Sequence, residues 1–192
     1  RYRVCLLEAG PADNSPFIRV PAGIIPLFRS KTYNWHYWTQ ADAGCDNRSL
    51  FWPRGRTLGG SSAINAMCYI RGHASDYDHW AELGNSGWSY ADVLPWFKRS
   101  ERYEPALDDP SLLPWHGTRG PLNVARRRYD SPLSAVFLEA ARQAGYTDND
   151  DFNGAEQEGF GSYKVFQKDG QRCSNAHAYL GQARNRPNLD IR

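Results

Sequence analysis

The residues best suited to binding chemistry lie in one glycine-rich stretch, RGRTLGGSSAINAMCYIRG, residues 54–72. Gly59 and Gly60 lack a Cβ atom, so they can adopt positive φ and let a ligand or another chain segment contact the peptide groups. The two serines that follow can cap a helix over residues 63–67, and the N–H groups of such a helix start favour an anion. A tight turn without a ligand uses the same Gly-Gly pair, so the stretch by itself leaves both interpretations open.

Glu8 is the second residue placed for binding chemistry. It lies in the apolar run VCLLEAG, which predicts a buried parallel strand close to the start of the chain. In dinucleotide-binding folds an acidic residue at a strand end accepts hydrogen bonds from the adenosine ribose, about 20 residues after a GxGxxG turn. Because this sequence has no such turn, the feature alone favours the alternative, a carboxylate exposed at a strand end.

The composition is that of a soluble globular protein, with 41% hydrophobic and 23% charged residues among 192. The formal net charge is +2 and no Lys or Arg run is long enough to follow a phosphate backbone, which argues against a nucleic-acid partner. The four cysteines form no CxxC pair, so we expect reduced thiols in the cytoplasm, no metal site and no disulfide framework. No apolar run approaches the roughly 20 residues that span a bilayer.

The chain opens with Arg1 rather than Met, and the strand predicted next to it has no earlier segment with which to pair. A buried strand within a sheet normally pairs with neighbouring strands, because an unpaired edge leaves its backbone groups without partners. We therefore expect the sequence to be an internal segment of a longer protein, for which the lack of a signal peptide carries no information.

Helices are predicted at three places in the middle of the chain. Residues 75–84 form a short helix capped by Ser75, and Ser89 begins a second one that Pro95 should bend or shorten. The clearest helix covers residues 131–145 and has one apolar face, formed by Leu133, Val136, Phe137, Ala140 and Ala144.

The two ends of the chain predict mixed elements: irregular and extended segments near the start, and a turn, a helix and a strand near the end. Residues 11–26, rich in Pro, Asn, Asp and Ser, predict an irregular excursion, and the aromatic residues 31–40 predict an extended segment packed on a larger surface. The Asp-Gly pair at 169–170 predicts a hairpin turn, followed by a last helix over residues 175–184 and a strand at 188–192.

As one pattern, the glycine-rich stretch and its surroundings resemble a known family. They match, in type and spacing, the first signature of the glucose-methanol-choline (GMC) flavin oxidoreductases at Gly55, Arg56, Leu58, Gly59, Gly60, Ser61, Ser62, Ile64, Asn65, Tyr69, Gly72 and Asp78. The resemblance continues through LLEAG, WPRG, YIRGH, GPL and RPNL, and it is greatest to the choline dehydrogenase and aliphatic alcohol dehydrogenase branch. It favours a ligand cradle over a plain turn.

The resemblance implies an α/β fold in three parts. Residues 1–115 would be part of a Rossmann-like FAD-binding domain with its lid and signature segment, residues 116–173 the start of a substrate-binding domain, and residues 174–192 a return to the FAD domain. FAD would lie along the signature segment, with Glu8 as the ribose-binding acid. The residues implied to contact the cofactor are Glu8, Ala9, Arg56, Thr57, Leu58, Gly59, Gly60, Ser61, Asn65, Ala66 and Met67.

The resemblance also implies an activity. The complete enzyme would oxidise a primary alcohol, choline or an aliphatic alcohol, to the aldehyde by hydride transfer to FAD, and a quinone or oxygen would reoxidise the flavin. Its partners would be the remaining segments of the same enzyme, in the cytoplasm, with peripheral association at the inner face of the membrane left open. The alternative is a non-catalytic FAD-binding or structural product of a split or truncated gene.

Some family members attach FAD covalently through a histidine one residue before the Asn of the signature. That position is Ile64 in this sequence, and its side chain has no nucleophilic atom. The resemblance therefore implies non-covalent FAD. The catalytic histidine of the family would lie beyond Arg192, so no catalytic residue and no metal ligand is assigned.

Trp35 and its neighbours, and the five histidines, each have a structural and a functional interpretation. Trp35 resembles a substrate-pocket tryptophan of choline-oxidising relatives, which would attract a quaternary ammonium, but a packed lid is the favoured interpretation of Trp35 and its aromatic neighbours. The five histidines show no acidic partner at a readable spacing, so we expect surface or capping roles for His36, His73, His79, His116 and His177. The resemblance also implies that His116, in WHGTRGPL, occupies a structural position of the family.

Overall fold

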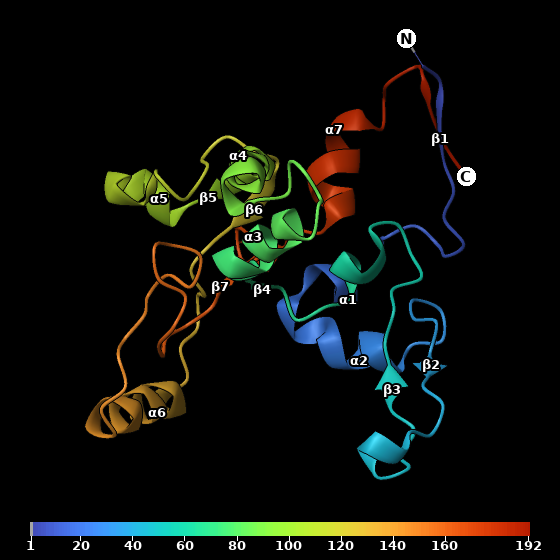
Figure 1. Cartoon of the computed structure of the whole chain (residues 1–192). Helices are drawn as coiled ribbons and strands as arrows, with labels where there is room; N and C mark the ends of the chain where they lie inside the picture. Colours follow the sequence, from blue (N-terminus) through green and yellow to red (C-terminus); the bar gives the residue numbers. More distant parts are fainter. Residues whose placement is uncertain (1) are drawn as a thin grey trace. The chain divides into compact units, whose positions relative to one another are not determined.

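The computed structural model describes residues 2–192, which divide into two compact units (Figure 1). Unit 1 runs to Met67 and resumes at Asp169–Arg192, and unit 2 is Cys68–Lys168. This division concerns contacts within the present chain. The assignment of residues 1–115, 116–173 and 174–192 to domains of a complete enzyme stays a prediction.

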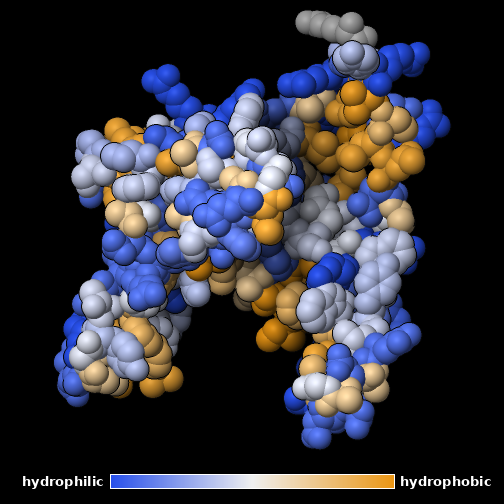
Figure 2. Space-filling model, in the orientation of Figure 1, coloured by the Kyte–Doolittle hydropathy of each residue, from blue (hydrophilic) through white to orange (hydrophobic). Residues whose placement is uncertain are grey.

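The predicted strands at the two ends of unit 1 form a parallel pair. β1 (Val4–Leu6) pairs with β10 (Leu189–Ile191), and Val4 lies opposite Leu189. The expected burial of β1 is wrong, because Val4 is 51% and Leu7 77% exposed. Within the described residues β1 has β10 as its one paired strand, and Figure 2 shows apolar side chains at the surface over this pair. A strand is buried only when neighbours cover its edges and faces.

Two short helices replace the irregular excursion expected over residues 11–26. They are α1 (Pro16–Arg19) and α2 (Ile24–Arg29), joined through a 3-10 turn at Pro21–Gly23. The prediction is wrong because residues typical of loops, proline among them, also occur at helix starts. Pro16 and Pro21 stand instead in first turns, where a missing N–H costs no hydrogen bond and the fixed φ suits the helix.

The apolar core of unit 1 is small and joins these helices to the signature segment. It consists of Ile18 from α1, Leu27 from α2, and Ala63 and Ile64. Each of these four side chains is at most 3% exposed. The signature segment is therefore held from behind by the two helices.

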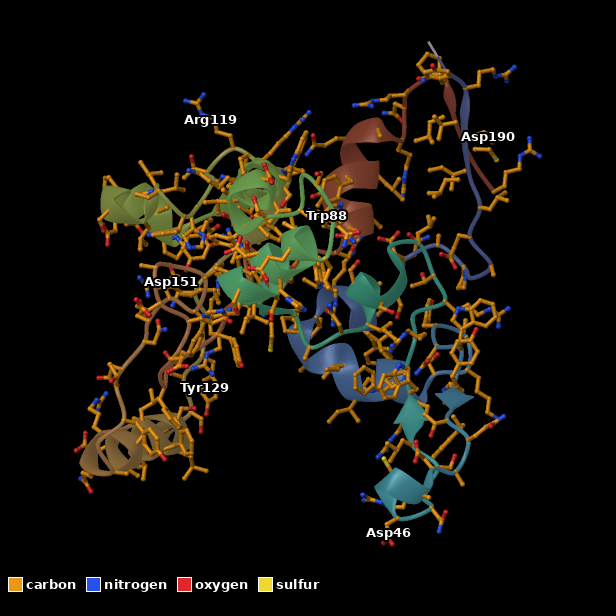
Figure 3. All side chains as sticks on the ribbon, in the orientation of Figure 1. Asp46, Trp88, Arg119, Tyr129, Asp151 and Asp190 are labelled. Carbon is orange, nitrogen blue, oxygen red and sulfur yellow. The ribbon has the colours of Figure 1, made fainter. Side chains whose placement is uncertain are left out.

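A hairpin precedes the signature segment. β2 (Tyr37–Trp38) pairs antiparallel with β3 (Phe51–Trp52), and the loop between them passes Asp46, labelled in Figure 3. The expected extended conformation is confirmed at β2. The expected packing on a larger surface is not found in unit 1, since Trp38 is 63% exposed.

Unit 2 begins with two capped helices, α3 (Ala74–Glu82) and α4 (Tyr90–Ser100). Ser89 caps α4 as predicted. The helix continues for five residues beyond Pro95, so the predicted shortening is wrong, and the alternative prediction of a bend stays a prediction. The predicted cap of α3 is also wrong, because His73 takes that position. Its Nδ1 accepts from the backbone N–H of Ser75 at 3.2 Å, so an imidazole nitrogen replaces the usual hydroxyl oxygen.

Short strands connect the helices of unit 2. β4 (Cys68–Tyr69) pairs antiparallel with β7 (Lys164–Val165), and β5 (Glu101–Tyr103) pairs in parallel with β6 (Leu122–Val124). The buried cluster beneath them consists of Tyr69, Tyr103, Ala106 and Val124. Unit 2 also contains α5 (Pro105–Asp108), a 3-10 turn at Pro110–Leu112, and β8 (Gln167–Lys168).

The helix predicted over residues 131–145 is confirmed as α6 (Pro132–Gln143), with Gly145 at φ +86° as its stop. Its apolar face is mostly exposed, although the ring of Phe137 lies 5.8 Å from that of Phe160. Leu133 is 77%, Val136 66% and Phe137 61% exposed. The apolar periodicity thus predicted the helix correctly, although the face is not buried here.

The last segment of unit 1 begins at the predicted turn, where Asp169 and Gly170 both have positive φ, as a type I′ turn requires. β9 (Gln171–Arg172) follows, then a π-helical turn at Ala176–Leu180 that continues into α7 (Gly181–Ala183). The predicted last helix is therefore confirmed, with a π-helical first part. Across residues 2–192, no helix has the length and apolar character that crossing a membrane would need.

Candidate cofactor-binding site

The signature segment forms a turn and not the helix expected over residues 63–67. Gly59 has φ +89° and Gly60 φ +55°, and a 3-10 turn covers Gly60–Ala63. The helix prediction is wrong because the serines bond inside the loop: Ser62 Oγ donates to the Gly59 carbonyl at 2.6 Å, and Ser61 Oγ accepts from an N–H at 3.1 Å. A turn of four residues offers no helix terminus for an anion.

The glycines of this region lie in two different environments, one crowded by the chain itself and one open. A Cβ on Gly10 would lie 2.0 Å from the Arg56 carbonyl oxygen, and one on Gly55 would lie 2.2 Å from the Gly60 oxygen. At these two positions the chain contacts itself. A Cβ on Gly60 would meet no atom within 4 Å, so this peptide faces open space at positive φ. Open backbone at Gly60 fits a cofactor that lies against it.

The end of β1 and the signature segment are brought together in unit 1. Thr57 is fully buried, and its hydroxyl donates to the Pro11 carbonyl at 2.8 Å; Leu58 N–H donates to the same oxygen at 3.2 Å. Glu8 is half-buried, and its Oε1 accepts from Gly10 N–H at 2.9 Å. That bond fixes the carboxylate at the strand end, the position of a ribose-binding acid. Ala9 between them is exposed.

Arg56 provides a test of whether the site suits an anionic cofactor. Its Nε is buried and has no hydrogen-bond partner among the described residues. Its guanidinium lies 5.1 Å from the centroid of the Trp35 ring. A buried donor without a partner costs free energy, and a phosphate or other anion beside Arg56 would remove that cost. The residues present therefore fit FAD.

The far end of the segment carries a strained residue. Met67 is 5% exposed and has φ +62°, a conformation that bulky side chains rarely adopt. Asn65 Oδ1 accepts from Met67 N–H at 3.1 Å and stabilises this turn, while Ala66 is exposed. Backbone strain of this kind is often found at ligand sites.

Arg172 belongs to the same site, although no pattern in the sequence indicates it. Its Nε donates to the Ile18 carbonyl at 2.9 Å, and its Nη1 donates to the carbonyl and side-chain oxygens of Asn65 at 2.7 and 2.9 Å and to the Ser62 carbonyl at 3.2 Å. Burial lowers the pKa of Arg172 to about 10. The residue lies 107 positions from Asn65, so no local spacing connects them.

A hollow of about 540 Å³ borders Arg172 within unit 1. Among its lining residues Asp13 is the only acid, and it lies 3.7 Å from Arg184. The other charged or titratable lining residues are basic, so the hollow favours an anionic occupant: Arg19, Arg172, His177 and Arg184.

Trp35, the candidate substrate contact, is 42% exposed. Its ring is stacked on Tyr37 at 5.9 Å, and Arg56 covers it as described. Packing in the lid accounts for these contacts. A quaternary ammonium would have to share the ring with a guanidinium, and the role of Trp35 toward substrate stays a prediction.

Unit 2 contains a buried network of charged groups that the sequence did not reveal. Glu101 is fully buried and accepts from Arg71 Nη2 at 2.8 Å, from the Tyr69 hydroxyl and from His116 Nδ1 at 3.1 Å. His116 Nε2 lies 2.8 Å from the carboxylate of Asp151, labelled in Figure 3. Although burial opposes ionisation, the hydrogen bond from His116 and the charge of Arg71 hold the pKa of Glu101 below its usual value.

The surface or capping role expected for His116 is therefore wrong. Burial opposes its charged form, but hydrogen bonds to Asp151 and Glu101 raise its pKa above the usual value. The partners lie 35 and 15 residues away, beyond any readable spacing. The side chains of Arg71, Glu101 and His116 are at most 2% exposed, so we interpret the network as a support of the fold.

The other histidines largely follow the expectation. His73 caps α3, and His79 and His177 are exposed. His79 does have an acidic neighbour, Glu82, at 3.5 Å. His36 is half-buried, so its expected surface or capping role is not observed.

The fold and the glycine-lined turn define a flavoprotein oxidoreductase segment. The chain belongs to the GMC oxidoreductase family, whose model matches residues 16–192. Proteins of this family bind FAD, and the mixed α/β fold corresponds to their N-terminal FAD-binding region.

Known proteins resemble nearly the whole chain. The "Oxygen-dependent choline dehydrogenase" of Brucella anthropi is 45% identical over 191 residues, which is 100% of this chain and 34% of the relative. That of Rhizobium johnstonii is 46% identical over 188 residues, 98% of this chain and 33% of the relative. The chain therefore spans about a third of the length of these curated relatives.

Solved structures show the same fold. The crystal structure of pyridoxine 4-oxidase from Mesorbium loti superposes with a TM-score of 0.89 at 37% identity, over 98% of this chain and 36% of that one. A formate oxidase variant of Aspergillus oryzae superposes with a TM-score of 0.85 at 27% identity, over 99% of this chain and 33% of that one.

Proposed function

We propose that the chain is the N-terminal, cofactor-binding part of a longer FAD-dependent enzyme that oxidises a primary alcohol, choline or an aliphatic alcohol, to the aldehyde. The observation that carries the proposal is the family match over residues 16–192, which includes the turn whose Gly60 backbone faces open space. FAD, when bound, accepts a hydride from the alcohol carbon. The names of the choline dehydrogenase relatives support choline as substrate and oxygen as acceptor, and a quinone is the second candidate acceptor.

The residues of this chain bind and orient the cofactor. Glu8 accepts hydrogen bonds from the ribose, Gly59 and Gly60 let the pyrophosphate approach the backbone, and Arg56 supplies a positive charge. Asn65 and the two residues after it lie beside the flavin. The base that removes the hydroxyl proton comes from the remaining segments of the same polypeptide.

The test is purification of the complete polypeptide that contains this chain. We expect bound FAD, bleaching of its absorbance under anaerobic choline or octanol, and formation of the corresponding aldehyde. Protein that contains FAD but is reduced by no alcohol would support the non-catalytic FAD-binding alternative. Protein without flavin would contradict both.

Glu8→Ala in the complete protein is expected to weaken FAD binding by about 1.5–3 kcal/mol, because hydrogen bonds to a charged group are lost. The ratio of flavin to protein after gel filtration measures the effect. Glu82→Ala is the matched control, since this carboxylate is exposed and lies in unit 2. Equal flavin content in the two variants would show that Glu8 is a surface carboxylate without a role in FAD binding.

FAD is expected to be held without a covalent bond, because Ile64 has no atom that can form one and packs in the core at 2% exposure. Acid precipitation of the complete protein should release yellow flavin into the supernatant. A washed pellet that stays yellow would show a covalent link. The thiol of the exposed residue Cys68 would then be the first position to examine by peptide mapping.

A further inference from the structure

Arg172 has contacts that the proposed FAD site does not explain. It is 5% exposed, and its donors reach α1 through Ile18 and the signature turn through Ser62 and Asn65. The segment that contains Arg172 makes a second contact with the signature turn, because Asn175 N–H donates to Ser62 Oγ at 2.9 Å. The segment after the 169–170 turn is thus the support of the signature turn.

The contacts of Arg172 determine which way the Asn65 amide points. Asn65 Oδ1 accepts from Arg172 Nη1 at 2.9 Å and from Met67 N–H at 3.1 Å. Only the oxygen of an amide can accept two such bonds, so the oxygen faces inward and the NH₂ group points the other way. Asn65 is half-buried, and within residues 2–192 its NH₂ group is neither buried nor bonded.

The charge of Arg172 is not balanced inside the protein. Among the described residues no carboxylate forms an ion pair with it, and its Nη2 is buried without a partner. An apolar side chain of similar length would fill the same space without the cost of burying a cation. Packing alone therefore does not account for a guanidinium at this position.

We propose that Arg172 is a positioning residue of the cofactor site: it holds the Asn65 oxygen inward and so presents the Asn65 NH₂ group as a fixed donor to FAD. The inference rests on the proposed function, since FAD is the ligand. A fixed donor with a positive charge behind it favours an electron-rich acceptor atom. It also stabilises the reduced cofactor, which carries more negative charge, over the oxidised one.

The decisive variant is Asn65→Asp in the complete protein. It keeps an oxygen for Arg172 and adds an ion pair, but it replaces the outward donor by an acceptor. We expect the FAD-free protein to unfold at the same or a higher temperature than wild type, while the Kd for FAD rises at least tenfold. Arg172→Met should shift the reduction potential of bound FAD to a more negative value, and Arg172→Lys should restore part of that shift.

Arg29→Met is the matched control, because Arg29 is an exposed residue at the end of α2 in the same unit and does not line the hollow beside Arg172. A wild-type affinity for FAD in Asn65→Asp would overturn the inference, as would equal potentials for Arg172→Met and Arg29→Met. If Arg172→Met does not fold, Asn65→Asp decides alone, since it leaves Arg172 in place. Wild-type protein that binds no FAD would instead overturn the proposed function and this inference with it.

Discussion

Glu101→Leu is expected to destabilise the protein by about 3–5 kcal/mol, the range for removing one member of a buried ion pair. The substitution leaves the guanidinium of Arg71 and the imidazole of His116 buried without the carboxylate that they share. Asp151 still pairs with His116, but it does not reach Arg71. Urea unfolding of the complete protein, followed by tryptophan fluorescence, measures the loss.

Glu82→Leu is the control for this loss, because the side chain is 75% exposed, and its effect should stay within about 0.5 kcal/mol. Similar unfolding midpoints for the two variants would show that the network contributes little. The pH dependence is a second check. Since the pKa of Glu101 is lowered in the folded state, its stabilisation is present above the unfolded value of about 4 and is lost as the pH falls. Glu101→Leu should therefore weaken the acid sensitivity.

Gly10→Ala is expected to cost about 3 kcal/mol or more, at the upper end of the range for overpacking. The added Cβ would lie 2.0 Å from the Arg56 oxygen and 2.6 Å from the Thr57 nitrogen, and backbone atoms cannot move aside as a flexible side chain does. The end of β1 would be pushed from the signature segment. Both the thermal unfolding temperature and the flavin content should fall.

Gly181→Ala is the matched control for this substitution. The nearest atom to its added Cβ would be the Ala176 oxygen at 3.9 Å, an ordinary contact, and alanine favours a helix. We expect an unchanged or slightly raised unfolding temperature. A Gly10→Ala protein as stable as Gly181→Ala would show that the strand end and the signature segment separate without cost.

Local spacing predicted the features that depend on neighbours in the sequence. The Ser89 cap, the stop of α6 at Gly145 and the turn at Asp169 each require residues within a few positions, and each is confirmed. The positive φ of Gly59 was anticipated for the same reason. Local geometry limits such positions to few residue types.

The features that the sequence did not reveal depend on contacts between distant residues. Arg172 reaches Asn65 across 107 residues, and Glu101 meets Arg71 across 30. A single arginine or glutamate reads as a surface residue, because most are exposed. Pro16 shows a different limit of prediction from sequence. Proline can stop a helix in its interior but favours its first turn, where Pro16 lies, so the residue type alone does not say which occurs.

The parallel pairing of β1 with β10 also determines when this part of the protein can fold. Val4 and Leu189 lie 185 positions apart, whereas the β2–β3 pair Trp38 and Phe51 lies only 13 apart. Closing the longer loop costs about 2 kcal/mol more chain entropy. During synthesis, at about 5–20 residues per second, β1 waits roughly 10–40 s before its partner strand exists. The pairing of β1 with β10 therefore comes late in synthesis, at a time when the β2–β3 hairpin can already have formed.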